Sequence, residues 1–225
     1  MEAKIDPLWK IFQLADSTFP TGGFAHSGGL EAALQHGEIK TADEFENFLS
    51  QALWQIGHGG LPLVNAAYQA PEKLSEWDQT NDVFLSNHVS NRGSRIQGRT
   101  FFSTCRRTFP NSLFDEIAKV AELESFYSHY APLFGAIFRA LEVDREMTQR
   151  LHLQFALRTV VSAAVRLGIV GPYEAQRIQH KFAEVLTKVL ESCGKLQVSD
   201  LAQTSPLIDL FQSNHDRLYS RLFQT

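Results

Sequence analysis

The fold is decided by residues 146–168, EMTQRLHLQFALRTVVSAAVRLG, which have the apolar spacing of a long helix with almost no polar face. Between Leu153 and Leu167 the only charged side chains are those of Arg158 and Arg166. A helix that is apolar on nearly every side must be covered by other elements, so we expect it at the centre of the protein. An arginine buried there must be paired, because desolvation of its charge is costly. The partner is either internal, a carboxylate or a backbone carbonyl, or it belongs to an interface, where arginine is enriched.

Helical patterns continue on both sides of this segment. Apolar residues recur at helical intervals between Pro, Gly and Thr interruptions, and no run alternates over the length that a sheet would need. We expect helices over residues 8–16, 28–36, 43–57, 61–70, 72–90, 91–108, 112–125, 133–143, 172–192 and 205–222. The sequence thus predicts an all-α fold, a single globular domain (residues 1–225) of about ten helices around a buried central helix.

Several of these helices have recognisable start signals. Thr41 and Glu44 have the spacing of a capping box, in which each side chain binds the backbone amide of the other residue. Pro132, Pro172 and Pro206 stand where helices are expected to begin, and proline favours the first helical position.

Composition limits the class of protein. Of the 225 residues, 44% are hydrophobic and 20% are charged, as in an ordinary folded domain. The net charge of -4 argues against a nucleic-acid-binding protein, which normally carries a basic surplus. The first residues lack an apolar signal segment, and no run approaches the roughly 18 apolar residues that span a bilayer. We therefore expect a cytoplasmic protein that binds neither nucleic acid nor membrane.

Residues 14–31, LADSTFPTGGFAHSGGLE, form the most unusual loop of the chain. Its glycines suggest a phosphate-binding loop, but no Lys or Arg occurs between Lys10 and Lys40 and no strand precedes it. We therefore expect no nucleotide hydrolysis at this loop. Two interpretations stay open: a packing corner in which Ser27 caps the next helix, or a surface that presents Phe24 and His26 to a partner.

No catalytic or metal-binding pattern stands out. The eight histidines include no i,i+4 pair and no HExxH pattern, and no serine lies in a GxSxG motif. Cys105 and Cys193 lie 88 positions apart without a CxxC partner, so we expect free thiols. The sequence predicts no catalytic residue, no metal ligand and no tightly bound cofactor.

Arginines gather on one face of the expected helix 91–108. Arg92, Arg95, Arg99 and Arg106 fall within about 60° on a helical wheel, opposite a face of mostly small residues. Arginine rather than lysine favours planar carboxylate partners. Three interpretations stay open: a solvated cationic face, internal pairing with residues 1–60, which hold eight acidic residues and three lysines, or pairing with an acidic second protein.

The last segment, residues 205–225, is amphipathic, with apolar residues at helical intervals. Such a segment either folds back on its own domain or docks in a groove of a partner. Both interpretations stay open at this point.

Several blocks of the chain together resemble the urease accessory protein F (UreF) family. In the family's order they are residues 14–31, the region Arg92–Gly98, HYAPLFG (129–135), SAAVRLG (162–168) and HDRLYSRLF (215–223). Two departures are the Gly171-Pro172-Tyr173 corner, where a Gly-Gln-type step is common, and His215-Asp216 in place of the usual His-Glu. Because the blocks cover nearly the whole chain, the resemblance is specific.

The resemblance implies an all-helical protein that forms a homodimer and catalyses no reaction of its own. It implies a urease accessory protein that, with UreD (also called UreH), recruits and regulates the GTPase UreG while the urease nickel centre is assembled. The partners would handle nickel and GTP, and the urease apoprotein would be reached through UreD.

The resemblance also suggests which residues contact partners. Segment 205–225 would dock on a partner, with Arg217–Phe223 engaging UreD, and the glycine-rich loop with the nearby helix would face UreG or the dimer mate. The expected contact residues are Thr21, Gly22, Gly23, Phe24, His26, Ser27, Glu31, Arg92, Arg95, Arg99, Arg166, Arg217, Tyr219, Arg221 and Phe223.

Two other functions stay open. One is an all-α enzyme with an unrecognised pocket. The other is a direct nickel carrier that uses His26, His36 and His215.

Overall fold

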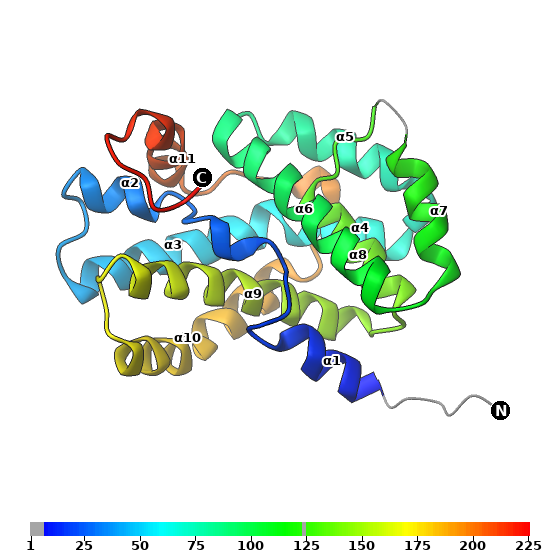
Figure 1. Ribbon diagram of the computed structural model, residues 1–225, viewed down its shortest axis with the longest axis horizontal. Helices are drawn as coiled ribbons and strands as arrows, with labels where there is room; N and C mark the ends of the chain where they lie inside the picture. Colours follow the sequence, from blue (N-terminus) through cyan, green and yellow to red (C-terminus); the bar gives the residue numbers. More distant parts are fainter. Residues whose placement is uncertain (1–6, 123–124) are drawn as a thin grey trace.

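The central apolar segment forms α9 (Arg145–Arg166), and the other helices pack around it (Figure 1). The structure is a computed structural model that describes residues 7–122 and 125–225. α9 is buried over most of its length, as expected of a helix without a polar face. Its neighbours are α2 (Leu30–Gln35), α3 (Ala42–Gly59), α4 (Leu61–Gln69), α8 (Tyr130–Ala140) and α10 (Pro172–Cys193).

The described residues form eleven α-helices and four short 3-10 helices and contain no strand, which confirms the all-α prediction. None of these helices combines the length and apolar character needed to cross a bilayer. The remaining elements are α1 (Pro7–Ala15), α5 (Leu74–Phe84), α6 (His88–Thr108), α7 (Ser112–Ala121), α11 (Pro206–Asn214), η1 (Gly23–Ala25), η2 (Pro71–Lys73), η3 (Val198–Asp200) and η4 (His215–Arg217).

Phenylalanine rings fill the core between α6 and α8. The rings of Phe134 and Phe138 stack with centroids 4.3 Å apart, and Phe101 stacks on them at 5.4 and 6.1 Å. Phe155 of α9 meets Phe134 edge to face at 5.8 Å. Such pairs contribute about 0.5–1.5 kcal/mol each beyond the area that they bury. The rings therefore join α9 to the pair formed by α6 and α8.

Two glycines allow the elements of this core to approach closely. A Cβ on Gly98 of α6 would lie 2.0 Å from the carbonyl oxygen of Ser128. A Cβ on Gly135 of α8 would lie 2.2 Å from the carbonyl oxygen of Val64 in α4. Because no side chain fits at these distances, the small residues of α6 face a neighbouring segment, as the helical wheel predicts.

Some helix boundaries agree with the sequence and others do not. The capping box is confirmed: the Glu44 amide donates to Thr41 Oγ1 at 3.2 Å, and the Thr41 amide donates to Glu44 Oε2 at 2.9 Å. α8 begins at Tyr130, so Pro132 is its third residue and not its first. α7 ends at Ala121, and residues 123–124 of the predicted helix 112–125 lie outside the described residues.

Two other predicted helices are too long. α5 ends at Phe84 and not near residue 90, because Asn87 starts α6 by accepting the amide of Val89 at 2.9 Å. α11 ends at Asn214 and not near residue 222, because the following residues turn back toward the glycine-rich loop. The colours of Figure 1 show this red segment beside the blue loop.

Replacing Gly98 with Ala should lower the free energy of unfolding by about 3 kcal/mol, since the new Cβ meets backbone and not a movable side chain. Urea unfolding followed by circular dichroism measures the change. Ser103→Ala, at an exposed position of the same helix, is the control and should shift the stability by less than about 0.5 kcal/mol. Equal stability of the two variants would contradict the close packing at Gly98.

Candidate functional site

The glycine-rich loop lies against α6 and α9. Gly22, Gly28 and Gly29 have φ of 80°, 63° and 92°, in the left-handed region that favours glycine. A Cβ on Gly22 would lie 3.1 Å from Thr100 Cβ, and one on Gly23 would lie 2.8 Å from Thr159 Oγ1. The loop therefore follows a fixed path between two helices, which supports the packing-corner interpretation.

Arg158 and Arg166 of the central helix hold this loop. Arg158 Nη1 donates to the carbonyl oxygen of Ala15 at 2.6 Å, and Arg166 Nη1 donates to that of Phe24 at 2.5 Å. The Arg166 guanidinium also lies between two rings, with its carbon 4.0 Å from the centroid of Phe24 and 4.2 Å from that of Phe223. The internal interpretation of these arginines is confirmed, with backbone carbonyls as acceptors.

Residues 215–225 turn back and pair with the loop. The Gln224 amide donates to the Ala25 carbonyl at 2.9 Å, and the Ser27 amide donates to the Thr225 carbonyl at 2.7 Å. The Ser27 hydroxyl donates to the same carbonyl at 3.3 Å. The prediction that Ser27 caps the next helix is therefore wrong, because the N-cap of α2 is Gly29 and Ser27 binds residue 225 instead.

A buried carboxylate anchors the returning segment. Glu31 accepts the amide of Leu222 at 2.6 Å and that of Phe223 at 3.2 Å. His215 is also buried and donates from Nε2 to the Phe223 carbonyl at 3.2 Å. Hydrogen bonds to a carboxylate are stronger than neutral ones and offset the cost of burying it. Residues 215–225 are therefore held from inside, and we call them, with loop 14–31 and the first half of α6, the junction.

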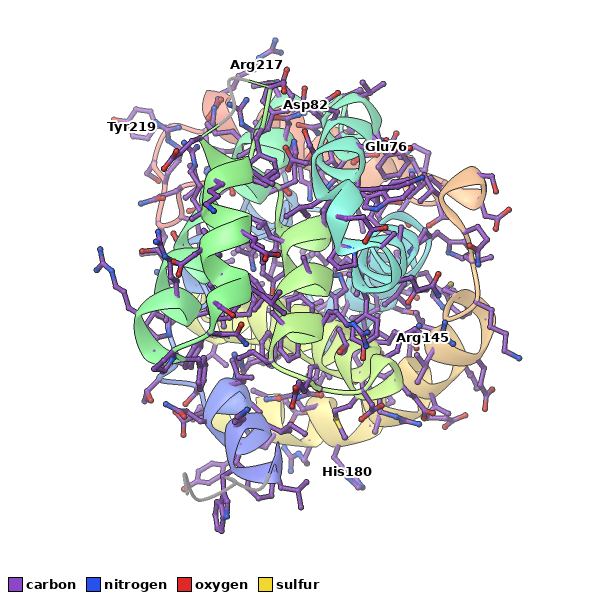
Figure 2. All side chains as sticks on the ribbon, turned by 90° about the vertical axis from the view of Figure 1, so that its right-hand side faces the viewer. Glu76, Asp82, Arg145, His180, Arg217 and Tyr219 are labelled. Carbon is purple, nitrogen blue, oxygen red and sulfur yellow. The ribbon has the colours of Figure 1, made fainter. Side chains whose placement is uncertain are left out.

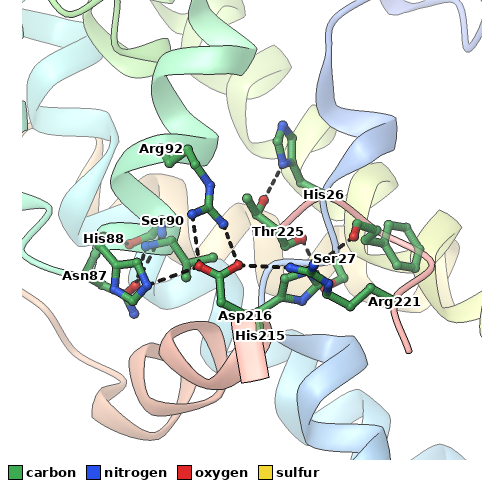
Figure 3. A network of polar contacts seen from close by, with 12 residues as sticks. His26, Ser27, Asn87, His88, Ser90, Arg92, His215, Asp216, Arg221 and Thr225 are labelled. Atoms are coloured by element: carbon green, nitrogen blue, oxygen red, sulfur yellow. Dashed lines mark hydrogen bonds and ion pairs between the residues drawn. The ribbon is translucent and has the colours of Figure 1, made fainter. Parts of the chain in front are cut away.

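Asp216 ties the junction to α6, as Figure 3 shows. Its carboxylate accepts two hydrogen bonds from Arg92, at 3.0 and 2.8 Å. Arg221 Nη1 lies 3.2 Å and His88 Nε2 lies 3.3 Å from the same carboxylate. The hydrogen bonds from Arg92 are the main reason that the pKa of Asp216 falls to about 2.

His26 is enclosed by the junction. Its Nδ1 forms a short hydrogen bond with Thr225 Oγ1. Burial, and after it the neighbouring His215 and Arg92, lower the pKa of His26 to about 4, so the ring is neutral near pH 7. The part of the chain that the structure describes contains no group of three or more His, Cys, Asp or Glu side chains that could hold a metal ion.

Cys105 and Cys193 are both free, as predicted, and both are buried. Cys193 Sγ lies 3.6 Å from Nδ1 of His58. Burial raises the pKa of both thiols, which disfavours the reactive thiolate.

The predicted contact residues divide into an inner and an outer set. The interpretation that Phe24 and His26 are both presented is right for Phe24, which is 67% exposed, and wrong for His26, which is 7% exposed. The inner, buried set is Thr21, Gly23, His26, Ser27, Glu31 and Phe223. The half-buried residues are Gly22, Arg92, Arg95 and Arg166. The outer, exposed set is Phe24, Arg99, Arg217, Tyr219 and Arg221.

The arginines of α6 do not pair with the acidic N-terminal third, among the residues described from position 7 onward. Arg92 binds Asp216, and Arg106 Nη2 lies 3.0 Å from Asp115 Oδ1. The interpretation of internal pairing with residues 1–60 is therefore wrong, because these residues contribute no ion pair to α6 in the described structure.

Among the members of the junction that were not predicted contact residues are Asp216, His88 and Thr225. Asp216 lies within the block HDRLYSRLF, so the resemblance pointed to its neighbourhood. His88 precedes the first arginine of α6 by one helical turn, which places it on the same face. No sequence signal connects Thr225 with His26, since 199 positions separate them.

Comparison with known proteins shows which family the chain resembles in sequence. The UreF family model matches residues 39–183 of this chain. The chain is 38% identical over 221 residues to urease accessory protein F of Arabidopsis thaliana, covering 96% of this chain and 91% of that protein. It is 37% identical over 227 residues to urease accessory protein F of Oryza sativa subsp. japonica, covering 97% and 85%. It is 30% identical to urease accessory protein UreF of Bacillus sp. (strain TB-90), covering 97% and 99%.

Replacing Arg92 with Gln should raise the pKa of Asp216 from about 2 toward its ordinary value of 3.8, because the hydrogen bonds that favour the charged carboxylate are lost. The lowered pKa means that the contacts of Asp216 stabilise the fold above pH 4 or so and lose this effect as the pH falls through about 2. The variant should show less of this acid-dependent loss. Carboxyl carbon NMR titration reads out the pKa.

Arg106→Gln is the control for this titration. Arg106 lies further along α6 and pairs with Asp115 of α7, so its replacement should leave the pKa of Asp216 unchanged. An unchanged Asp216 pKa in Arg92→Gln would show that Arg92 does not hold this carboxylate.

Phe223→Ala should loosen the junction without unfolding the protein, since it removes a buried ring that covers Arg166. The amides of Ser27 and Leu222, which bond across the junction, should exchange with solvent at least about tenfold faster. Hydrogen exchange followed by NMR measures both rates. Tyr219→Ala, at a fully exposed ring, should leave them unchanged, and equal protection in the two variants would refute the role of Phe223.

Proposed function

The chain belongs to the UreF family of urease accessory proteins, and from this premise we propose that it is an adaptor and not an enzyme. In this proposal it acts as a homodimer, with UreD, to recruit and regulate the GTPase UreG while nickel is placed in urease. It holds neither nickel nor GTP tightly itself. The relatives named above are accessory proteins, which supports a role in urease assembly.

The observation that carries the proposal is the construction of the junction. Three of the blocks by which the chain resembles the family meet there: loop 14–31, the start of the arginine helix and residues 215–223. Glu31 and Ser27 use their buried polar groups in contacts between these blocks, and Arg92 binds Asp216 across them. What the junction offers outward is a set of aromatic, apolar and cationic side chains on a fixed backbone, which is the composition of a protein interface.

Several large hydrophobic or aromatic side chains of the junction are exposed to solvent. Tyr219 is fully exposed, and Phe24 and Leu222 are 67% and 52% exposed. Figure 2 shows Arg217 and Tyr219 projecting from one edge of the molecule, on the side opposite His180. Tyrosine and arginine are enriched among residues that dominate binding energies, so we place the contact with UreD on this edge.

The chain's own chemistry supports leaving the nucleotide to a partner. The glycine-rich loop, the segment most similar to a phosphate cradle, has no lysine or arginine between Lys10 and Lys40. Its glycines instead serve close packing on Thr100 and Thr159.

Neither alternative function gains an observation of its own. An enzyme would need reactive groups that converge on a cavity. The partly open cavity of about 260 Å³ between α3, α6 and α9 is lined mainly by apolar and neutral polar side chains, with His26, His152 and Asp209 among its titratable residues. A nickel carrier using His26, His36 and His215 would need these rings on one accessible surface. His26 and His215 are buried in the junction, whereas His36 is exposed at the end of α2.

The double substitution Arg217→Glu with Tyr219→Ala should weaken binding to UreD at least about tenfold, or about 1.4 kcal/mol, because it removes two exposed contacts and reverses one charge. Co-purification and biolayer interferometry with separately expressed UreD measure binding, and circular dichroism confirms the fold. Tyr173→Ala removes an exposed tyrosine at the start of α10 and serves as the control. Failure of the wild-type chain to bind UreD or UreG in any nucleotide state would overturn the adaptor function.

A further inference from the structure

A cationic groove runs beside the junction. It is formed by the outer face of α6 and the end of α5. We propose that this groove binds a carboxylate side chain of a partner protein through Arg95 and Arg99. The inference deepens the proposed function, on which it rests for the identity of the partner. The residues that matter here are Asp82, Leu85, Asn91, Arg92, Arg95 and Arg99.

The carboxylates already present in the groove's neighbourhood are engaged elsewhere. Asp82 Oδ1 accepts a hydrogen bond from Asn91 Nδ2 at 2.9 Å and lies 3.1 Å from Nε2 of the buried His129. Asp216 is held by Arg92, Arg221 and His88. Within the described residues, no ion pair joins Arg95 or Arg99 to a carboxylate. Two adjacent guanidinium groups are therefore left without an ion-pair partner among the described residues, and the nearby Asp82 carboxylate offsets only part of their charge.

Arg95 is held in position for a ligand. Its guanidinium carbon lies 5.0 Å from the centroid of the Tyr127 ring, which covers one face of the group. Its Nε is buried and, in the described structure, has no hydrogen-bond acceptor. Because this Nε is closed to solvent, an incoming carboxylate is met by the terminal nitrogens of the half-buried side chain, while the unpaired Nε costs the free protein about 1–3 kcal/mol.

Arg99 is placed one turn further along the same face. Its Nε donates to the backbone carbonyl of Arg95 at 3.3 Å, which directs the side chain along the helix toward Arg95. The side chain is exposed, so its remaining donors are open to a partner. Each of the two guanidinium groups is planar, and its N–H donors match the two oxygens of a carboxylate.

The charges around the groove favour an anion with a single charge. Four guanidinium groups, those of Arg92, Arg95, Arg99 and Arg221, stand around the carboxylates of Asp82 and Asp216, which leaves two positive charges. A carboxylate offsets one of them. A phosphate dianion carries a second negative charge and would be repelled more strongly by the two carboxylates already present.

The position of the groove favours a protein partner. Arg92 lines the groove and also binds Asp216 of the junction, so the groove continues the surface on which we place the partner contact. Figure 2 shows Asp82 at the same edge of the molecule as Arg217 and Tyr219. A partner that covers the exposed aromatic residues can therefore place an Asp or Glu side chain in the groove.

A fluorescein-labelled hexaglutamate peptide tests the groove without any partner. Its binding, measured by fluorescence anisotropy, should be at least tenfold weaker for Arg95→Gln with Arg99→Gln than for the wild-type chain. Arg107→Gln, on the same helix but outside the groove, is the matched control and should bind as the wild type does. Inorganic phosphate at the same concentration should not displace the peptide. Unchanged binding by the double variant, no binding by the wild type, or displacement by phosphate would each overturn the carboxylate site.

A second measurement separates this inference from the proposed function. UreD and UreG are titrated separately against the wild type and the double variant, whose fold is checked by circular dichroism. We expect the double variant to bind one of them at least tenfold more weakly, with a smaller dependence on salt. If wild type and variant bind both proteins equally well, the proposal that a partner carboxylate binds in the groove is refuted, and the adaptor function is unaffected. No binding by the wild type would end the adaptor function, while the peptide titration would still decide the groove's preference.

Discussion

Hydrogen bonds from two arginines of α9, Arg158 and Arg166, determine where the N-terminal loop lies. Most of the surface around the central helix is apolar, so each guanidinium needs an acceptor that another segment brings to it. The carbonyls of Ala15 and Phe24 are these acceptors, one at the end of α1 and one in η1. With both carbonyls fixed, the loop between them must cross the central helix, and its glycines are the residues that fit there. The path of residues 215–225 then follows from the loop, since Ala25, Ser27 and Glu31 are its binding partners.

The contacts of the junction explain why its chemistry is directed inward. Glu31, the one acidic residue of the loop's second half, accepts hydrogen bonds from two backbone amides. The carboxylate of Asp216 binds basic side chains. His26 is neutral and faces Thr225. Groups bound in this way position a backbone but are not available to a substrate. The exposed residues around them have the size and charge that protein recognition uses, so the same sequence block serves stability on one side and binding on the other.

The sequence was a good guide where structure depends on local pattern and a poor one where distant residues meet. The buried helix, the Thr41 capping box and the small face of α6 follow from periodicity and spacing within one segment. The early ends of α5 and α11 could not be predicted this way, because a cap by Asn87 and a turn toward the loop decide them. The burial of His26 depends on residue 225, and the partner of Arg92 is an aspartate 124 positions away. The number of acidic residues in the sequence indicated that the arginines of α6 could find carboxylate partners, but not which acidic residue would reach them.

The arginine face of α6 looks uniform in sequence, yet the fold divides it by distance to a carboxylate. Arg92 and Arg106 stand opposite Asp216 and Asp115, so their charges are used in holding the protein together. Arg95 and Arg99 stand between these pairs and form no ion pair with a described carboxylate. Two exposed or half-buried guanidinium groups without an ion pair contribute little to the stability of the free chain. The position of these two arginines beside the junction is therefore better explained by recognition than by folding, and electrostatic recognition acts chiefly on the rate and specificity of association.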